Sequence, residues 1–393
     1  MQLTAEQQSS FDTLAYWLLT PEQHLVIDGP AGAGKGYLLR YLMSQQGQSE
    51  LNLIVNTVSA EKLPPMFATA TTNEAVTSMG IVGTSTIYRA TGIRPNGNKG
   101  FVTNKIVNNK KHIIIVDEAS FINEDAFNLI VRQFPSSKFI WVMDQYQLAP
   151  IGSSIPHVAT LDTTWINLTE VNRSKGALSK LVYDLRDNVR TKTSTALHSY
   201  HNGNDIIVVN DNYQFNQMMK QDFIADQTNT STLCFRNEMV DGYNKAIHSK
   251  VLNYPEYPAK GQQVVTKSYA MGIPVGSRGC ILEVMDQEFN YSNRENKYTI
   301  PCKYIQTTLG EFYDADLSVL SPADRKIFSA NYEGQLNNLS LPYAMTVHKA
   351  QGRTINNVYV HAHDINTSWD KEMVRRLLYV AISRATTKVV IYG

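Results

Sequence analysis

Six short aliphatic runs recur along the chain, and the segments between them carry hydrophobic residues at helical spacing. The runs are HLVID (24–28), HIIIVD (112–117), KFIWVMD (138–144), STLCF (231–235), NNVYVHA (356–362) and KVVIY (388–392). Their apolar character is continuous rather than alternating, which is typical of parallel strands buried on both faces. The pattern therefore predicts an α/β fold with parallel sheets. Four of these strands end at candidate functional residues, where open α/β sheets hold their ligands.

The pattern changes in two places. Tyr, Thr, Gly and Pro become frequent between about 263 and 339, where short runs separated by turns predict a small β-rich insert. Turn signals within 92–111 predict a β-hairpin insert, with a plain surface loop as the alternative. The strands fall into two groups, and 393 residues exceed the roughly 250 to 300 at which single hydrophobic cores stop growing. We therefore expect two α/β units.

Composition narrows the class of protein further. With 43% hydrophobic and 18% charged residues, and no apolar run of about 18 residues, the chain reads as globular and not as a membrane protein. Its amino-terminal segment has no basic stretch followed by an apolar core, so we expect a cytoplasmic location. Cys234, Cys280 and Cys302 lack CxxC spacing, which argues against disulfides and a zinc site. The net charge of +1 neither requires nor excludes nucleic acid.

The first predicted strand leads into GPAGAGKGYLL (29–39), followed by a helical pattern. This context suits a phosphate-binding P-loop, in which backbone N–H groups cradle phosphates and Lys35 reaches their β and γ oxygens. Gly36 stands where the pattern GxxxxGK[ST] has the hydroxyl that binds Mg²⁺. A water molecule can replace that ligand, at a cost of about 1.5 to 3 kcal/mol, or about 10- to 100-fold in affinity or rate. The candidate ATP-binding loop consists of Gly29, Pro30, Ala31, Gly32, Ala33, Gly34, Lys35, Gly36 and Tyr37.

Other strand ends carry further candidate chemistry. Asp117 and Glu118 follow the second strand, where one carboxylate can hold Mg²⁺ and the other can polarise a water. Gln147 follows the third strand, and its amide can contact both a γ-phosphate and the attacking water. Arg173 and Arg384 can stabilise transition-state charge, although a surface salt bridge is the alternative for any single arginine.

Eight segments occur in the order typical of one enzyme family. They are LTAEQQSSF, GPAGAGKG, ATATTNEA, VDEAS, DQYQLAP, LTEVNRS, AMTVHKAQGRT and LLYVAISRA. Together they resemble the motifs of superfamily 1 DNA helicases, most closely the RecD-like branch, superfamily 1B, with its small phage enzymes. The resemblance implies two RecA-like P-loop domains, the first spanning 1–178 with the hairpin insert, the second 179–262 and 340–393. It also implies that 263–339 form a small SH3-like insert.

The resemblance further implies a role for each matching residue. ATP and Mg²⁺ would bind between the two RecA-like domains, with Gln7 reading the adenine, Asp117 holding the metal and Glu118 the water. Lys35, Gln147, Arg173 and Arg384 would complete the catalytic set. Single-stranded DNA would lie along Thr72, Asn73, Tyr88, Thr346, His348 and Gln351, and Phe101 would be the pin that separates the duplex. Taken alone, His348 and Tyr88 would more often be structural. Thr71 departs from the family pattern, because many relatives have proline there.

Two functions remain open. The first is an ATP-dependent helicase or translocase, with 5′ to 3′ movement implied by the resemblance. The second is a nucleotide-dependent single-stranded DNA-binding protein with weak or no turnover. The retained Glu118, Gln147, Arg173 and Arg384 favour the first, and Gly36 favours the second. Expected partners are single-stranded DNA and junctions with duplex, with single-stranded-DNA-binding and replication proteins as candidates. The family expectation is a monomer.

Overall fold

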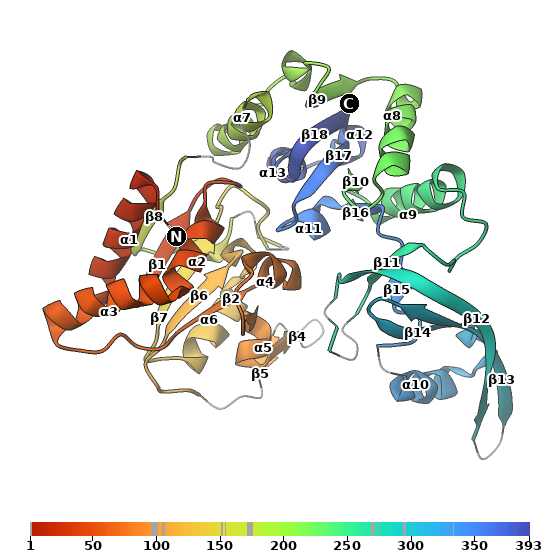
Figure 1. Ribbon diagram of the computed structural model, residues 1–393, viewed down its shortest axis with the longest axis horizontal. Coiled ribbons are helices and arrows are strands. Elements are labelled where there is room, and N and C mark those ends of the chain that lie inside the picture. The colour runs from red at the N-terminus through yellow and green to blue at the C-terminus, as the bar shows by residue number, and fades with distance from the viewer. Residues whose placement is uncertain are drawn as a thin grey trace. The chain divides into compact units, whose positions relative to one another are not determined.

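A six-stranded parallel sheet forms the centre of the P-loop half (Figure 1). The computed structural model describes all residues except 1, 96–100, 104–106, 151, 154, 171–175, 269–271, 274, 294–295 and 333. The order of the strands is β3-β2-β6-β7-β1-β8. Their bounds are β1 His24–Asp28, β2 Met66–Ala70, β3 Ser85–Thr86, β6 Ile113–Asp117, β7 Lys138–Met143 and β8 Thr164–Asn167.

Alternate residues of these strands face two separate cores. Leu25, Ile27 and Ile115 pack with α1 to α4 on one face, whereas Val26 and Trp141 pack with α5 and α6 on the other. This burial on both faces explains why the strand sequences are continuously aliphatic. The helices are α1 Ala5–Leu18, α2 Lys35–Met43, α3 Gln45–Ser59, α4 Asn73–Met79, α5 Ile87–Thr91 and α6 Glu124–Gln133.

The strands of the second sheet are parallel too. The chain divides into two compact units, Met1–Asn210 with Val347–Gly393, and Asp211–Thr346. In the first unit β17 (Ile355–His361), β18 (Ala385–Tyr392) and β9 (Ile206–Val209) pair in that order. In the second unit β10 (Thr230–Cys234) pairs with β16 (Ala344–Thr346). The associated helices are α7 Ala177–Thr191, α8 Asn212–Ala225, α9 Asn237–Ala246, α11 Val347–Ala350, α12 Ala362–Ile365 and α13 Lys371–Ile382.

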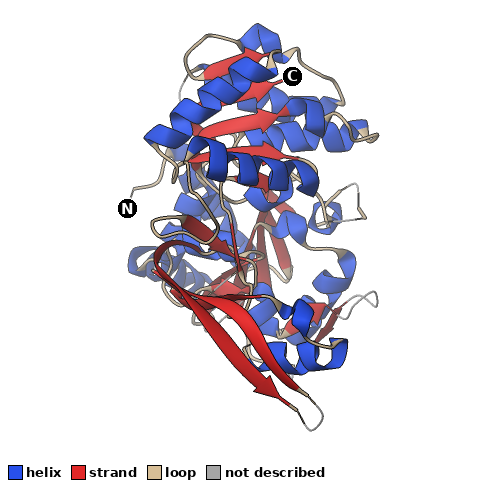
Figure 2. Cartoon of the chain, turned by 90° about the vertical axis from the view of Figure 1, so that its right-hand side faces the viewer, coloured by secondary structure: helices blue, strands red, loops and turns tan. Residues whose placement is uncertain are grey.

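Two antiparallel sheets are added to this framework. The larger has the order β14-β13-β12-β11-β15, and its long β12–β13 hairpin lies near α10 (Figure 2). The smaller pairs β4 (Ile93–Pro95) with β5 (Phe101–Thr103). The elements of the larger sheet are β11 Gln263–Thr266, β12 Arg278–Ser292, β13 Lys297–Thr307, β14 Gly310–Ala315, α10 Pro322–Asn331 and β15 Leu339–Ser340.

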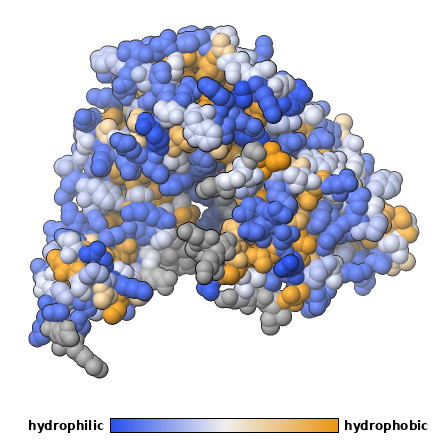
Figure 3. Space-filling model, turned by 180° about the vertical axis from the view of Figure 1, so that it is seen from behind, coloured by the Kyte–Doolittle hydropathy of each residue, from blue (hydrophilic) through white to orange (hydrophobic). Residues whose placement is uncertain are grey.

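The predicted fold class is confirmed: two RecA-like parallel sheets are present, together with small antiparallel inserts. All six predicted strands occur, within a few residues of their expected ends. Strands β2, β3, β8, β9 and β16 of the parallel sheets were not predicted. Among the described residues, no helix is both long and apolar enough to cross a membrane. Hydrophilic side chains predominate on the face drawn in Figure 3, and the hydrophobic ones lie in small separate groups.

A buried ion cluster joins α7 to the ends of β1 and β7. Arg186 Nη2 lies 2.8 Å from Asp28 Oδ2, and its Nε lies 3.1 Å from Asp144 Oδ1. Both carboxylates are almost fully buried, with side-chain exposures of 4% and 1%. Burial alone would lower the pKa of Arg186, but the carboxylates of Asp144 and Asp28 raise it above its usual value. The guanidinium therefore stays charged and neutralises two acids at the carboxyl edge of the sheet.

Replacing Arg186 with leucine should destabilise the protein by about 3 to 5 kcal/mol, because it leaves buried carboxylates without their cation. Equilibrium denaturation of purified variants measures the loss. The matched control is Arg190→Leu, one turn further along α7, whose ion pair with Asp187 is solvent-exposed, with side-chain exposures of 58% and 39%. That variant should lose at most about 1 kcal/mol. Equal losses in the two variants would contradict the stabilising role of the cluster.

Candidate active site

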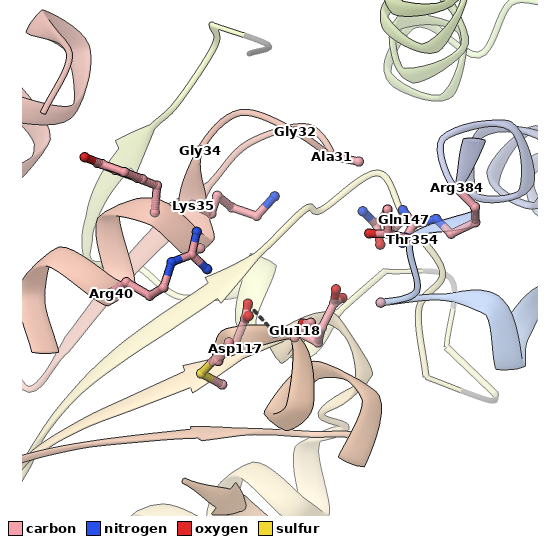
Figure 4. Close-up of a pocket in the computed structure, with 15 residues that line it drawn as sticks. Ala31, Gly32, Gly34, Lys35, Arg40, Asp117, Glu118, Gln147, Thr354 and Arg384 are labelled. Atoms are coloured by element: carbon pink, nitrogen blue, oxygen red, sulfur yellow. Dashed lines mark hydrogen bonds between the residues drawn. The ribbon is translucent and has the colours of Figure 1, made fainter. Parts of the chain in front are cut away.

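A cavity of about 450 Å³ opens at the carboxyl ends of β1 and β6, within the first compact unit (Figure 4). It is lined by Ala31, Gly32, Gly34, Lys35, Gly36, Tyr37, Arg40, Ser78, Met79, Asp117, Glu118, Gln147, Gly352, Thr354 and Arg384. The cavity thus brings together most of the residues that the sequence proposed for phosphate chemistry. Parallel strands explain this, because their carboxyl ends meet at one edge of the sheet.

The loop between β1 and α2 has the shape of a phosphate cradle. Gly32 and Gly34 adopt left-handed φ angles of 87° and 84°. The ammonium of Lys35 donates to the carbonyl oxygens of Gly29 at 2.6 Å and Pro30 at 3.0 Å. It forms no ion pair with any other described residue. The charge of Lys35 is therefore held over the loop and remains available to an anion.

Gln7 packs against this loop from α1. Its Oε1 accepts from the backbone N–H of Thr4 at 3.1 Å, as part of a capping box, and its Nε2 donates to Gly34 O at 3.4 Å. A Cβ on Gly34 would lie 2.4 Å from that amide nitrogen, so a larger residue would have to displace the Gln7 side chain as well as adopt the left-handed φ. Gln7 is buried and is not among the residues that line the cavity.

Position 36 has no such structural requirement. Gly36 lies in the first turn of α2, and its φ is outside the left-handed region. A Cβ there would meet one neighbouring atom, Arg40 Nη1 at 3.6 Å, which is an ordinary van der Waals contact. Both the backbone and the packing would therefore accept a side chain at this position.

Asp117 and Glu118 place two carboxyl groups on the opposite wall of the cavity. The backbone N–H of Glu118 donates to Asp117 Oδ1 at 2.8 Å. Burial, together with the neighbouring charge of Glu118, raises the pKa of Asp117 to about 7, while the charge of Lys35 acts in the opposite direction. Such concentrated negative charge favours a cation. One carboxylate with several waters is a common protein contribution to Mg²⁺ binding, so these residues fit that ion.

The backbone at Glu118 is strained, and two hydrogen bonds from Thr71 stabilise it. Glu118 has a left-handed φ of 53°, which is unfavourable for a residue with a side chain. Thr71 Oγ1 donates to Glu118 O at 2.9 Å, and Thr71 N donates to Asp117 O at 3.1 Å. Proline could make neither bond. The departure from the family pattern at position 71 therefore gives this chain a contact that holds the acidic pair.

Gln147 is buried in the loop after β7 and is one of the residues that line the cavity. Its Nε2 donates to Asp144 Oδ2 at 3.3 Å, and its Oε1 has no partner among the described residues. The hydroxyl of Tyr379 also donates to Asp144 and accepts from the P-loop N–H of Ala31 at 3.3 Å. Burial and the charge of Asp144 raise the pKa of Tyr379 well above its usual value, so it remains a neutral donor. The unpartnered Oε1 is suited to accept from a bound water.

Arg384 reaches the cavity from the end of α13 (Figure 4). It is buried, and burial lowers the pKa of its guanidinium. It donates to Val380 O at 3.1 Å and to Ser383 Oγ at 2.8 Å, but forms no ion pair with another described residue. A buried cation without a carboxylate partner is suited to an anionic ligand. Arg173, the other candidate arginine, lies outside the described residues.

Two segments that carry proposed DNA-contacting residues lie next to Glu118. Gln351 Nε2 donates to Ser120 Oγ at 3.1 Å and to Glu118 Oε2 at 3.4 Å. A Cβ on Gly352 would be 3.7 Å from Glu118 Oε1 and 3.9 Å from Thr72 Oγ1. Thr72 caps α4, and Asn73 is the first residue of that helix. The acidic pair and two segments proposed to bind DNA are thus direct neighbours.

The remaining candidates lie elsewhere. Tyr88 and Phe101 are half-buried and stack with centroids 6.2 Å apart and planes 8° from parallel. Burial raises the pKa of Tyr88 to about 12. Thr346 is buried at the end of β16, and His348 is half-buried in α11, where burial lowers its pKa. None of these four lines the cavity.

Five of the residues that line the cavity were not predicted from the sequence: Arg40, Ser78, Met79, Gly352 and Thr354. Arg40 could have been found, because it follows Gly36 by one helical turn and faces the same side of α2. Gly352 and Thr354 could have been found from their place beside Gln351. Ser78 and Met79 have no signal of their own, since only the packing of α4 brings them to the cavity.

The fold and the cavity define a P-loop protein with two RecA-like parallel sheets. Residues 2–211, more than half of the chain, match the family model described as AAA domain, and the chain belongs to that family. Residues 341–392 match the UvrD-like helicase C-terminal domain. Together with the relatives described next, these matches confirm the resemblance to superfamily 1B helicases.

Individual proteins are similar to this chain over nearly its full length. The ATP-dependent DNA helicase dda of Enterobacteria phage T4 is 21% identical, with 97% of each chain covered. Among solved structures, Pif1 helicase from Bacteroides in complex with ADP-AlF3 and ssDNA has a TM-score of 0.56 at 15% identity, covering 100% of this chain and 93% of that one. Pif1 helicase from Candida albicans has a TM-score of 0.53 at 17% identity, with 100% and 94% covered. These structures support the fold.

The contacts of Thr71 generate a test. Thr71→Val removes the hydroxyl that fastens the strained Glu118 turn, so ATP hydrolysis should fall by about 2- to 10-fold, the equivalent of one hydrogen bond of about 0.5 to 1.5 kcal/mol. Steady-state hydrolysis rates measure this effect, and Thr71→Ser should retain activity.

The matched control for this test is Thr69→Val. Thr69 lies two residues earlier on β2, and its hydroxyl donates to Ile115 O at 2.8 Å on the neighbouring strand. Its loss should destabilise the fold to a similar degree without slowing hydrolysis. If both valine variants slow hydrolysis equally, Thr71 has no special role at Glu118.

Proposed function

We propose that this protein is an ATP-dependent DNA helicase that moves along single-stranded DNA and separates duplex. The observation that carries the proposal is the convergence of Lys35, Asp117, Glu118, Gln147 and Arg384 on one cavity. A P-loop without an acid, an amide and an arginine would suit nucleotide binding alone, whereas this set suits hydrolysis. The relatives whose names describe ATP-dependent DNA helicase and Pif1 helicase support the DNA substrate.

Each residue has a distinct part in the proposed reaction. Bound ATP with Mg²⁺ supplies the phosphoanhydride whose cleavage drives movement. Lys35 and the loop N–H groups hold the phosphates, and Asp117 holds the metal. Glu118 accepts a proton from the attacking water, while Gln147 orients that water through its unpartnered Oε1. Arg384 and, by resemblance, Arg173 stabilise transition-state charge. Gln7 is the proposed adenine contact.

The proposed coupling to DNA passes through Gln351. Its amide contacts Glu118, and the neighbouring Arg353 forms a 2.6 Å ion pair with Glu74 on α4. Binding of a DNA strand would therefore change the surroundings of Glu118, the residue that activates water. The residues proposed to hold that strand are Thr72, Asn73, Tyr88, Thr346, His348 and Gln351.

We also propose 5′ to 3′ movement, RecA-like domains at 1–178 and at 179–262 with 340–393, and an insert at 263–339.

Gly36 supports one alternative, a nucleotide-dependent DNA-binding protein with negligible turnover. The loss of one Mg²⁺ ligand weakens the site by about 10- to 100-fold. A protein that only bound nucleotide would not need Glu118, Gln147 and Arg384, the residues suited to hydrolysis. Helicase activity is therefore the stronger proposal.

ATP turnover measured with and without single-stranded DNA distinguishes these functions. The native protein should hydrolyse ATP, and DNA should stimulate it. Lys35→Ala should abolish turnover, and Arg384→Ala should lower it by about 10³-fold or more, because transition-state arginines contribute that much.

Gly36→Thr is the variant that restores the hydroxyl, and a Cβ at this position meets no clash. It should raise turnover of an already active enzyme by no more than about 100-fold. If the native protein is inert with DNA and Gly36→Thr alone restores turnover, the protein is the DNA-binding alternative.

Phe101 generates a separate prediction. Phe101→Ala should slow unwinding of a forked duplex by about 5- to 100-fold, the value of one stacking contact, while DNA-stimulated ATP turnover stays within about twofold. Phe101→Tyr keeps the ring and should unwind normally. Parallel losses of unwinding and turnover in Phe101→Ala would exclude Phe101 as the separating pin.

A further inference from the structure

Arg40 is a cation of the cavity that the proposed mechanism does not use. It lies on α2, one turn after Gly36, and its guanidinium points into the same cavity as the ammonium of Lys35 (Figure 4). Its Nη1 lies 3.6 Å from the place where a Cβ on Gly36 would stand. The guanidinium therefore borders the space from which a serine or threonine hydroxyl would act.

Arg40 also lacks a partner among the described residues. It is half-buried, yet it forms no hydrogen bond or ion pair with any of them. In contrast, Lys35 donates to two loop carbonyls, and Arg384 donates to two carbonyls and a hydroxyl. Ordering an arginine side chain in a cavity carries an entropic cost that a ligand of opposite charge can offset.

The chemistry of the site restricts that ligand to an anion. A guanidinium has five N–H donors and no acceptor, so it cannot replace the hydroxyl as a metal ligand. Its planar donors match phosphate oxygens, and the amino-terminal end of α2 attracts phosphate to the same place. Arg40 therefore favours nucleotide phosphates but opposes a cation placed beside Gly36.

We propose that Arg40 contacts the phosphates of the bound nucleotide and supplies part of the positive charge that a hydroxyl-held Mg²⁺ supplies in other P-loops. This inference rests on the proposed nucleotide site. Its consequence is a nucleotide affinity that depends weakly on Mg²⁺. Gly36 and Arg40 then act as one unit, in which the guanidinium takes over part of the role of the missing hydroxyl.

Calorimetric titration with ADP and with a non-hydrolysable ATP analogue, in Mg²⁺ and in EDTA, tests the inference without any turnover. In EDTA, Arg40→Gln should weaken binding by about 10-fold or more, the value of a hydrogen bond to a charged group. In Mg²⁺ the loss should be clearly smaller, because the ion then neutralises the phosphates. Arg132→Gln is the matched control, since it removes the same charge from an exposed position on α6.

A second variant tests the unit itself. Gly36→Ser/Arg40→Gln restores the hydroxyl and removes the guanidinium, so its affinity should become about 10-fold or more dependent on Mg²⁺. If Arg40→Gln behaves as Arg132→Gln does, or loses equal affinity in both buffers, the inference is overturned. Lys35→Ala distinguishes the nucleotide site itself from the role of Arg40. If Lys35→Ala leaves binding unchanged, the nucleotide site itself is wrong; if only the Arg40 variants are without effect, the nucleotide site stands and Arg40 has no part in it.

Discussion

The carboxylate of Asp144 organises the site more than any other single group. It accepts from Tyr379, Gln147 and Arg186, which come from three separate parts of the first compact unit. Tyr379 in turn accepts an N–H of the P-loop. A buried charge persists only when it is paired and fully hydrogen-bonded, so these partners cannot be removed one at a time without large cost. The loop, the proposed water-orienting amide and α13 are thereby held to one carboxylate.

Positive and negative side chains lie on different sides of the cavity. Lys35 and Arg40 come from the P-loop and α2, Arg384 comes from α13, and Asp117 with Glu118 form the opposing acidic edge. The cations form no ion pairs with these acids in the structure. Opposite charges that face one cavity without pairing leave both sets available, which suits a ligand that is itself an anion carrying a divalent cation.

Sequence patterns predicted six strands of the parallel sheets and most of the residues of the cavity, because continuous aliphatic runs and strand-end residues are local features. They failed where structure depends on partners distant in the chain. Strand β2 contains Ala68, Thr69 and Ala70, whose small or polar side chains conceal a central strand. The bond from Thr71 to Glu118 exists only because β2 pairs with β6. The contact of Gln351 with Glu118 likewise depends on tertiary placement, which no motif spacing encodes.

The departure at Gly36 differs in kind from the other glycines of the loop. Gly34 has a left-handed backbone and the amide of Gln7 pressed against it, so its identity is set by the fold. Gly36 is helical, and a Cβ added there would make only an ordinary van der Waals contact with Arg40, so neither its conformation nor a clash at Cβ requires glycine. Because the fold does not require glycine at position 36, the identity of this residue affects the ligand and not the stability of the loop. The choice lies between a hydroxyl oxygen that binds Mg²⁺ and the guanidinium of Arg40 that binds phosphate. The phosphate-binding geometry of the loop is compatible with either.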